Sequence, residues 1–164
     1  MKKKFTVVIF TDLDGSLLNR DTFEFDNIKD YILKLLSRGI IIIPNSSKTE
    51  QEIEKFNEEL GVDLPFISEN GSFIYGLNLL NSNFPNKIIL SRDKEKLLKI
   101  FNDKVPKILK DKCIPISNIN KKEQEKILGQ KDDKLKAALN RKYTLPYLFT
   151  GNINEKNKLL KILN

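Results

Sequence analysis

The stretch FTVVIFTDLDGS, residues 5 to 16, joins a continuous apolar run to two aspartates that are separated by one residue. The run from Phe5 to Phe10 is rich in β-branched and aromatic side chains, which predicts a strand covered on both faces in a parallel sheet. Asp12 and Asp14 follow it directly, and ligands of open α/β sheets bind beyond the carboxyl ends of the strands. We therefore expect both carboxylates to lie at a ligand site.

The next part of the chain alternates between helix and strand. Apolar spacing predicts, in order, a helix at residues 26–38, a strand at 40–44, a helix that ends at Gly61, and strands at 66–68 and 72–75. Ser47 and Glu50 have the spacing of a capping box at the start of the second helix. Asn70-Gly71, between the last two strands, is a hairpin signal. This order predicts an α/β fold with a Rossmann-type parallel sheet.

The order of elements changes after residue 85. The patterns predict a strand at residues 87–90, a helix from about Asp93, a helical stretch at 121–140, a strand at 147–150 and a helix from Glu155. Asn, Ser, Gly and Pro residues collect between Gly76 and Pro85, which indicates a domain boundary. We expect the N-terminal part of an α/β core at residues 1–80 and an inserted α+β cap domain at residues 86–164, with both domains incomplete.

The composition excludes several classes of protein. Apolar residues make up 40% and charged residues 31% of the chain, which suits a globular protein. The single cysteine, Cys113, and the absence of histidine exclude an internal disulfide and a Cys/His zinc site, and they fit a reducing cytoplasm. The lysine-rich start imitates a signal peptide, but Asp12 and Asp14 end the apolar run too early. We expect no transmembrane segment and no membrane partner.

Positive charge is concentrated in the second half of the chain. Residues 1–85 carry 9 basic and 13 acidic groups, whereas residues 86–164 carry 20 and 9, and the net charge is +7. Such a field steers anionic ligands or nucleic acid toward a protein. The lysines are dispersed, however, as on solvated helix faces, and no nucleic-acid-binding motif accompanies them. We therefore expect no nucleic-acid partner.

The acidic pair has the chemistry of phosphoryl transfer. Two carboxylates attract a hard cation, and Mg²⁺ takes one or two carboxylates together with water and phosphate oxygens. Asp12 is placed to attack phosphorus and form an aspartyl-phosphate, while Asp14 is placed to protonate the leaving alkoxide. Gly15 allows a sharp turn close to the phosphate. The alternative is a pair of solvated loop acids.

Four segments carry a resemblance to a known family. The segment from Phe10 to Leu18 resembles the first signature of the haloacid dehalogenase superfamily. The chain is more closely similar to mannosyl-3-phosphoglycerate phosphatases, in the segments Pro44 to Thr49, Phe66 to Gly71 and Arg141 to Pro146. The resemblance implies a magnesium-dependent phosphatase whose substrate is a small phosphorylated sugar-glycerate.

The resemblance also implies roles for five further residues. Ser46 is expected to hold the transferring phosphoryl group, although it also suits a helix N-cap. Lys48 is expected to pair with substrate phosphate or carboxylate, unless it is an ordinary exposed lysine. Asn70 and Gly71 are candidates for substrate contact or a plain hairpin turn. Arg141 is expected to bind the glycerate carboxylate, or to form a surface salt bridge.

Some positions depart from the family pattern. Ser16 replaces the usual Thr, and Lys142 and Leu145 stand where the family usually has acidic residues. The family's third signature, a lysine, and its fourth, an acidic Gly-Asp segment, would both follow Asn164. We therefore expect a C-terminally truncated chain with exposed apolar faces and little activity of its own.

Three alternatives to this enzyme remain open. One is another sugar phosphatase with the same class of cap, and a second is an inactive fragment or relic. A third is a phosphoacceptor signalling domain, which by family resemblance carries its phosphorylated Asp after the third strand. This chain has Ser68-Glu69-Asn70 there, which argues against that class.

Overall fold

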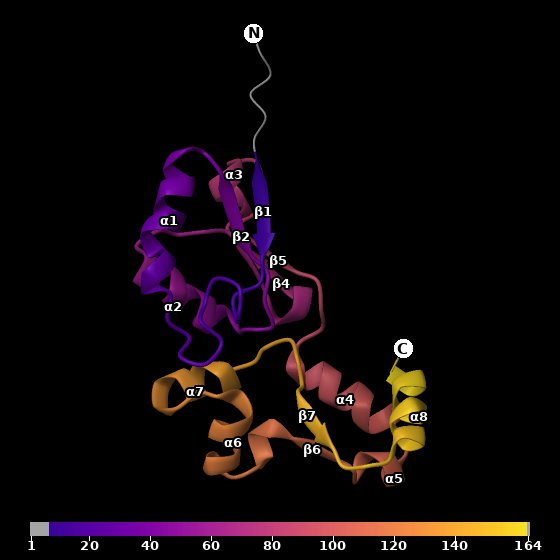
Figure 1. Cartoon of the computed structure of the whole chain (residues 1–164). Coiled ribbons are helices and arrows are strands. Elements are labelled where there is room, and N and C mark those ends of the chain that lie inside the picture. Colours follow the sequence, from indigo (N-terminus) through magenta and orange to yellow (C-terminus); the bar gives the residue numbers. More distant parts are fainter. Residues whose placement is uncertain (1–6, 164) are drawn as a thin grey trace. The chain divides into compact units, whose positions relative to one another are not determined.

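The computed structural model describes residues 7 to 163, which form two compact units that meet in the sequence at Leu90 and Ser91 (Figure 1). Phe5 and Thr6, where the first strand was expected to begin, lie outside the described residues. Among the residues described, no helix has both the length and the apolar character needed to cross a membrane. Each unit has its own sheet and helices.

The first unit contains five strands: β1 (Val8–Thr11), β2 (Ile41–Pro44), β3 (Phe66–Ser68), β4 (Phe73–Tyr75) and β5 (Lys87–Ile89). β1 pairs with β2 in parallel, and β3, β4 and β5 pair in antiparallel order. A parallel bridge between Asn45 and Ile67 joins the end of β2 to β3. The carboxyl ends of β1, β2 and β3 therefore meet at one edge, which confirms the predicted α/β class with a parallel sheet.

Two amphipathic helices cover one side of β1 and β2. Figure 1 shows α1 (Asp26–Ser37) and α2 (Glu50–Leu60) on the same side of these strands. The apolar residues of α2 recur at helical spacing, and Ile53, Phe56 and Leu60 are buried. Phe25, just before α1, packs on Phe56 with ring centroids 4.8 Å apart. A short helix, α3 (Leu77–Leu80), precedes β5.

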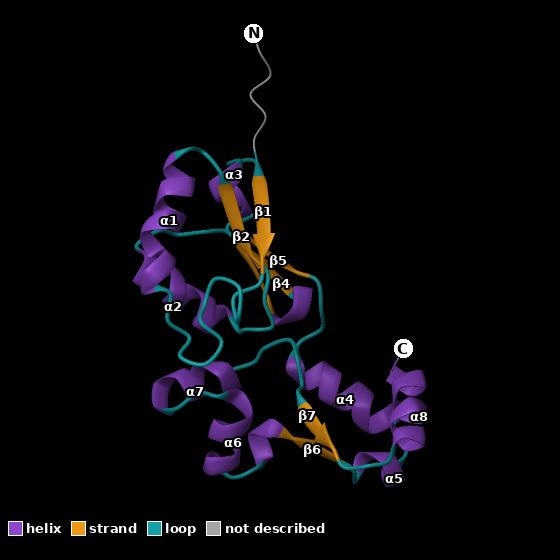
Figure 2. Cartoon of the chain, viewed as in Figure 1, coloured by secondary structure: helices purple, strands orange, loops and turns teal. Residues whose placement is uncertain are grey.

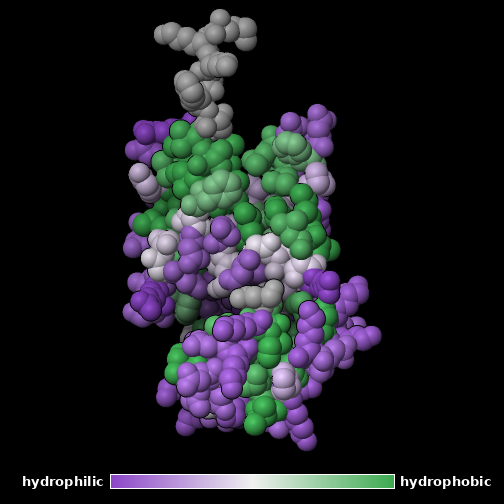
Figure 3. Space-filling model, turned by 90° about the vertical axis from the view of Figure 1, so that its right-hand side faces the viewer, coloured by the Kyte–Doolittle hydropathy of each residue, from purple (hydrophilic) through white to green (hydrophobic). Residues whose placement is uncertain are grey.

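The other side of β1 is open. Val8 and Phe10 are 42% and 61% exposed, so the expectation that this strand is covered on both faces is wrong for the described residues. The physical reason is that consecutive side chains of a strand point to opposite faces, and the two helices cover only one of them. Figure 3 shows apolar side chains gathered on one side of the first unit. Exposed apolar faces were expected from the sequence.

The start of α2 also differs from the prediction. The capping box is formed by Thr49 and Glu52, whereas Ser47 and Glu50 were expected to form it. Thr49 accepts the backbone N–H of Glu52, and the Glu52 carboxylate accepts the backbone N–H of Thr49 at 2.9 Å. The helix begins later because the backbone of Ser46 and Lys48 is already bonded to the segment after β3, as described below.

The second unit combines helices with a two-stranded antiparallel sheet (Figure 2). Its elements are α4 (Lys94–Lys104), α5 (Lys107–Lys110), β6 (Cys113–Pro115), α6 (Lys121–Leu128), α7 (Asp132–Leu139), β7 (Tyr147–Phe149) and α8 (Ile153–Leu163). Val105, Leu109 and Leu159 form a buried cluster against which Tyr147 and Phe149 pack. This cluster holds α4, α5 and α8 on the sheet.

The sequence-based description of this half was incomplete. The stretch at 121–140 is two helices, because Gly129 adopts a left-handed φ of 65° and ends α6. α5 and β6 were not predicted, since each is short and contains or follows a proline. β5, expected with the cap, pairs with β4 in the first unit. The assignment of the two units as core and cap remains a proposal.

Candidate functional site at the carboxyl ends of the first three strands

A tight loop follows β1 and presents the acidic pair. The Leu13 side chain is fully buried and anchors the loop, while the Leu18 N–H donates to the Leu13 carbonyl at 2.8 Å. Gly15 has a φ of +77°, which side chains rarely adopt, so the predicted sharp turn is confirmed. Asp12 is exposed and Asp14 is half-buried. The loop therefore places both carboxylates beyond the end of the strand.

The segments after β2 and β3 are joined by backbone hydrogen bonds. The Ser46 N–H donates to the Ile67 carbonyl at 3.0 Å, and the Asn70 N–H donates to the Ser46 carbonyl at 3.2 Å. The Glu69 N–H donates to the Lys48 carbonyl at 2.9 Å. Ser46 is buried and its hydroxyl accepts the Lys48 N–H at 3.3 Å, so it is not the N-cap of α2. These bonds fix Ser46, Lys48 and Asn70 in one platform.

The turn after β3 has an unusual backbone. Glu69 and Asn70 have φ values of 46° and 60°, and Gly71 has a φ of 88°. A left-handed φ at a buried glutamate costs free energy and persists only where surrounding bonds hold it, as the two bonds to residues 46 and 48 do here. The predicted hairpin is confirmed, with Ser68 opposite Phe73 and four residues between them. Substrate contact by Asn70 or Gly71 remains a proposal.

Lys48 connects the platform to the acidic pair. It is only 7% exposed, so the alternative of an ordinary exposed lysine is wrong. Its Nζ atom lies 3.0 Å from Asp14 Oδ1 and 3.3 Å from Glu52 Oε1, and it stands 4.8 Å from the centre of the Phe23 ring. The contact with Asp14 is an ion pair that lacks hydrogen-bond geometry. Asp14 Oδ1 is buried and accepts no hydrogen bond from the described residues.

The acidic pair offers carboxylate oxygens that suit a magnesium ion as ligands. Asp12 Oδ1 accepts the Leu13 N–H at 2.7 Å, which orients the carboxylate. The buried Asp14 Oδ1 has acceptor capacity left unused among the described residues. Within residues 7–163 no cluster of three or more His, Cys, Asp or Glu side chains is assembled around a metal position. Two carboxylates are nevertheless sufficient for Mg²⁺, which commonly keeps several waters and phosphate oxygens.

Arg141 belongs to the second unit and is described there by itself. It precedes β7, and its guanidinium donates to Thr144 Oγ1 at 3.1 Å. Arg141 also lines a small hollow of about 20 Å³ together with Lys94 and Ser117. That space is about the size of one water molecule and too small for a sugar phosphate.

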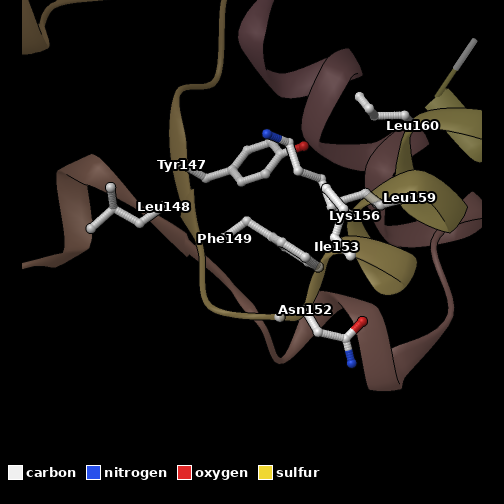
Figure 4. A pocket seen from close by; sticks show the side chains of 9 residues that line it. Tyr147, Leu148, Phe149, Asn152, Ile153, Lys156, Leu159 and Leu160 are labelled. Carbon is white, nitrogen blue, oxygen red and sulfur yellow. The ribbon is translucent and has the colours of Figure 1, made fainter.

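A larger cavity of about 510 Å³ lies between β7 and α8 and was not predicted. Figure 4 shows Tyr147 and Phe149 pointing from β7 toward α8, where Ile153 and Leu159 line the same cavity. Burial raises the pKa of the Tyr147 phenol, and Cys113 adds to the shift. Burial also raises the pKa of the Cys113 thiol. The lining is mostly apolar, so the cavity lacks the acidic chemistry of the first unit.

The structure thus brings together most of the residues that the sequence singled out. Asp12, Asp14, Ser46, Lys48 and Asn70 lie on adjoining segments of the first unit. Glu52 and Phe23, which contact Lys48, were missed. The spacing of Lys48 and Glu52, four residues apart at a helix start, was the available signal for Glu52.

The haloacid dehalogenase-like hydrolase family model matches residues 9–163 of this chain. A glucosyl-3-phosphoglycerate/mannosyl-3-phosphoglycerate phosphatase from Persephonella marina is 41% identical over 69 residues, which cover 42% of this chain and 26% of that relative. A mannosyl-3-phosphoglycerate phosphatase from Pyrococcus horikoshii is 47% identical over 68 residues, which cover 42% and 27%. The matched stretch therefore spans about a quarter of the length of these relatives.

Solved structures extend the likeness over nearly the whole chain. One of them is a phosphatase of the haloalkanoate enzyme superfamily from Bacteroides thetaiotaomicron. The match covers 96% of this chain and 60% of that phosphatase, with a TM-score of 0.61 and 12% identity. At that identity the likeness concerns the fold alone. It includes both units of the chain.

Proposed function

Because the chain belongs to the haloacid dehalogenase-like hydrolases, we propose that it acts as a phosphoric monoester hydrolase on mannosyl-3-phosphoglycerate or a close relative. The observation that carries the proposal is the convergence of Asp12, Asp14, Ser46 and Lys48 where β1 and β2 end. The names of the Persephonella and Pyrococcus relatives support the choice of substrate. Glucosyl-3-phosphoglycerate is the first alternative substrate.

The proposed reaction proceeds in two steps at the acidic pair. Asp12 attacks phosphorus, the ester P–O bond breaks, and Asp14 gives its proton to the departing alkoxide. Asp14 then takes a proton from the water that attacks the aspartyl-phosphate, which releases inorganic phosphate and restores Asp12. Ser46 and the neighbouring backbone amides are proposed to hold the phosphoryl oxygens, and Lys48 to balance their charge.

Mg²⁺ is the proposed cofactor, with Asp12 and Asp14 as its protein ligands. When bound, the ion neutralises phosphoryl oxygens so that a carboxylate can approach a phosphate dianion. The support is chemical: two carboxylates at one strand end, one with a buried oxygen that accepts no hydrogen bond from the described residues.

The remaining contacts are assigned to substrate selection. Asn70 and Gly71 are proposed to contact the non-reacting part of the substrate, and Arg141 to bind the glycerate carboxylate through its planar fork. Nucleic-acid and membrane partners form no part of the proposal. We place the activity in the cytoplasm, since a chain with the single cysteine Cys113 gains no disulfide from an oxidising compartment.

The first experiment measures Mg²⁺-dependent phosphate release from mannosyl- and glucosyl-3-phosphoglycerate by the 164-residue chain. Since little activity is expected of this chain, we expect Asp12→Asn to lower its phosphate release to the rate without protein, as loss of a nucleophile does. Asp21→Asn, an exposed acid outside the cluster, is the matched control and should keep the wild-type rate.

A second measurement tests the nucleophile without turnover. Beryllofluoride mimics a phosphoryl group on a carboxylate, and its binding is followed by fluorine NMR with and without Mg²⁺. We expect binding to the wild type and to Asp21→Asn but not to Asp12→Asn. A wild type that neither releases phosphate nor binds beryllofluoride would overturn the proposal and leave an inactive member of the family.

A further inference from the structure

Glu52 has two carboxylate oxygens with two different partners. Oε2 accepts the backbone N–H of Thr49 at 2.9 Å and the Thr49 hydroxyl at 3.0 Å. Oε1 lies 3.3 Å from the ammonium nitrogen of Lys48. The Glu52 side chain therefore stabilises the first turn of α2 and also holds the Lys48 ammonium, which faces Asp14.

The surroundings of Lys48 explain why such an anchor is needed. A buried ammonium is costly unless it is paired, and Lys48 is 7% exposed. Its compensating groups are the Asp14 carboxylate, the Glu52 carboxylate and the face of Phe23. A lysine stem has many rotamers, so the position of Nζ is set by these partners rather than by the backbone.

Resting on the proposed function, we propose that Glu52 is a positioning residue for the acidic pair. It holds the Lys48 ammonium between its own carboxylate and that of Asp14, and thereby sets how strongly Asp12 and Asp14 bind a divalent cation. Lys48 repels a cation bound at Asp14 through like charge, and Glu52 weakens that repulsion because it shares the ammonium, which would otherwise pair with Asp14 alone. Glu52 acts through Lys48 and is not itself offered as a ligand.

Three variants separate this role from helix capping. Glu52→Gln removes the charge that faces Lys48 but keeps an amide oxygen for the Thr49 N–H. Thr49→Ala is the matched control, because it removes the capping hydroxyl and leaves the Glu52–Lys48 pair in place. Lys48→Met removes the ammonium and keeps a stem of similar length.

The first readout is the NMR signal of the Lys48 ammonium, assigned by its absence in Lys48→Met. An ordered ammonium exchanges slowly with water and gives a resolved nitrogen–proton signal. We expect the signal in the wild type and in Thr49→Ala and its loss in Glu52→Gln. A signal that persists in Glu52→Gln, or that is absent from the wild type, would overturn the proposal.

The second readout is the Mg²⁺ dissociation constant, measured by calorimetric titration without substrate. We expect Glu52→Gln to weaken binding and Lys48→Met to strengthen it, each by about three- to tenfold, and Thr49→Ala to leave it unchanged. In the Lys48→Met background, Glu52→Gln should have a smaller effect than alone. Additive effects in this cycle would contradict an action through Lys48.

The two readouts keep this inference separate from the proposed function. A wild type that binds no Mg²⁺ counts against the metal site, while the ammonium spectrum still decides whether Glu52 holds Lys48. If Glu52→Gln does not fold, Lys48→Met carries the test, because an unchanged Mg²⁺ affinity in that variant would overturn the proposal.

Discussion

Single residues show where the backbone of the first unit has no room. Gly76 has a left-handed φ of +79°, and a Cβ atom there would lie 2.9 Å from the Pro65 Cα atom. Gly39 has the same φ but nothing within 4 Å of such an atom. The pair separates the cost of backbone strain from the cost of a steric clash.

We predict that Gly76→Ala destabilises the chain much more than Gly39→Ala. The left-handed strain alone costs about 1–2 kcal/mol, and forcing the Pro65 backbone to shift adds about 1–3 kcal/mol. Urea unfolding followed by circular dichroism measures the difference. Equal destabilisation by the two substitutions would mean that the Gly76–Pro65 contact relaxes without cost.

For single residues, the sequence predicted which side chains follow the first strand, but it did not predict that Lys48 is buried. The position of Asp12 and Asp14 after β1 and the turn at Gly15 were predictable because they depend on neighbours in the chain. The burial of Lys48 was not, because it depends on Asp14 and Phe23, which are distant in sequence. Local patterns carry no information about such pairings.

Among the elements, α8 begins with a pair of reciprocal hydrogen bonds. The Asn152 side chain accepts the Glu155 N–H at 3.0 Å, and Glu155 accepts the Asn152 N–H at 2.9 Å. Glu155 also forms an ion pair with Lys112. The hydrogen bond from Lys112, followed by that from Asn152, lowers the pKa of the Glu155 carboxyl group.

This lowered pKa predicts a pH-dependent effect of Glu155→Gln. A carboxyl group whose folded pKa is depressed adds stability above its unfolded pKa, near 4.3, and loses it as the pH falls through the folded pKa. Glu155→Gln should therefore be less stable than the wild type at pH 7, and the difference should vanish in more acidic solution. Urea midpoints from pH 7 to pH 3 measure this, with Glu95→Gln as the control for loss of one exposed charge.

Element types were predictable where periodicity was long, and boundaries were less so. α1, α4 and α8 begin or end within two residues of the predicted positions because their apolar spacing is regular. The start of α2 was predicted too early, because the backbone before this helix is bonded to the turn after β3. No local sequence rule encodes such contacts. β6 was missed because three residues, one of them proline, give no periodic pattern.

Over the whole molecule, the most informative feature is the open side of β1. Phe10 is 61% exposed, whereas Phe66 in the same unit is fully buried. Exposed apolar side chains contribute little to folding but favour association between chains. Phe66 is therefore expected to contribute to the stability of the fold, and Phe10 to contribute mainly to association between chains.

We predict that Phe10→Ser leaves the free energy of unfolding within about 0.5 kcal/mol of the wild type and lowers self-association. Phe66→Ala should cost about 3–5 kcal/mol, because it leaves a cavity in the core. Sedimentation velocity measures association, and urea unfolding measures stability. A large loss of stability in Phe10→Ser would mean that this face is covered in solution.

The platform after β2 and β3 has a further consequence for how new specificities arise. Its segments are held by bonds between backbone groups of residues 46, 48, 67, 69 and 70, none of which involves the backbone of Ser47. Exchanging the exposed side chain of Ser47 therefore leaves these backbone bonds in place. A mutant library at this position would vary the chemistry offered to a ligand while the chain keeps its shape, so selection can explore substrates one residue at a time.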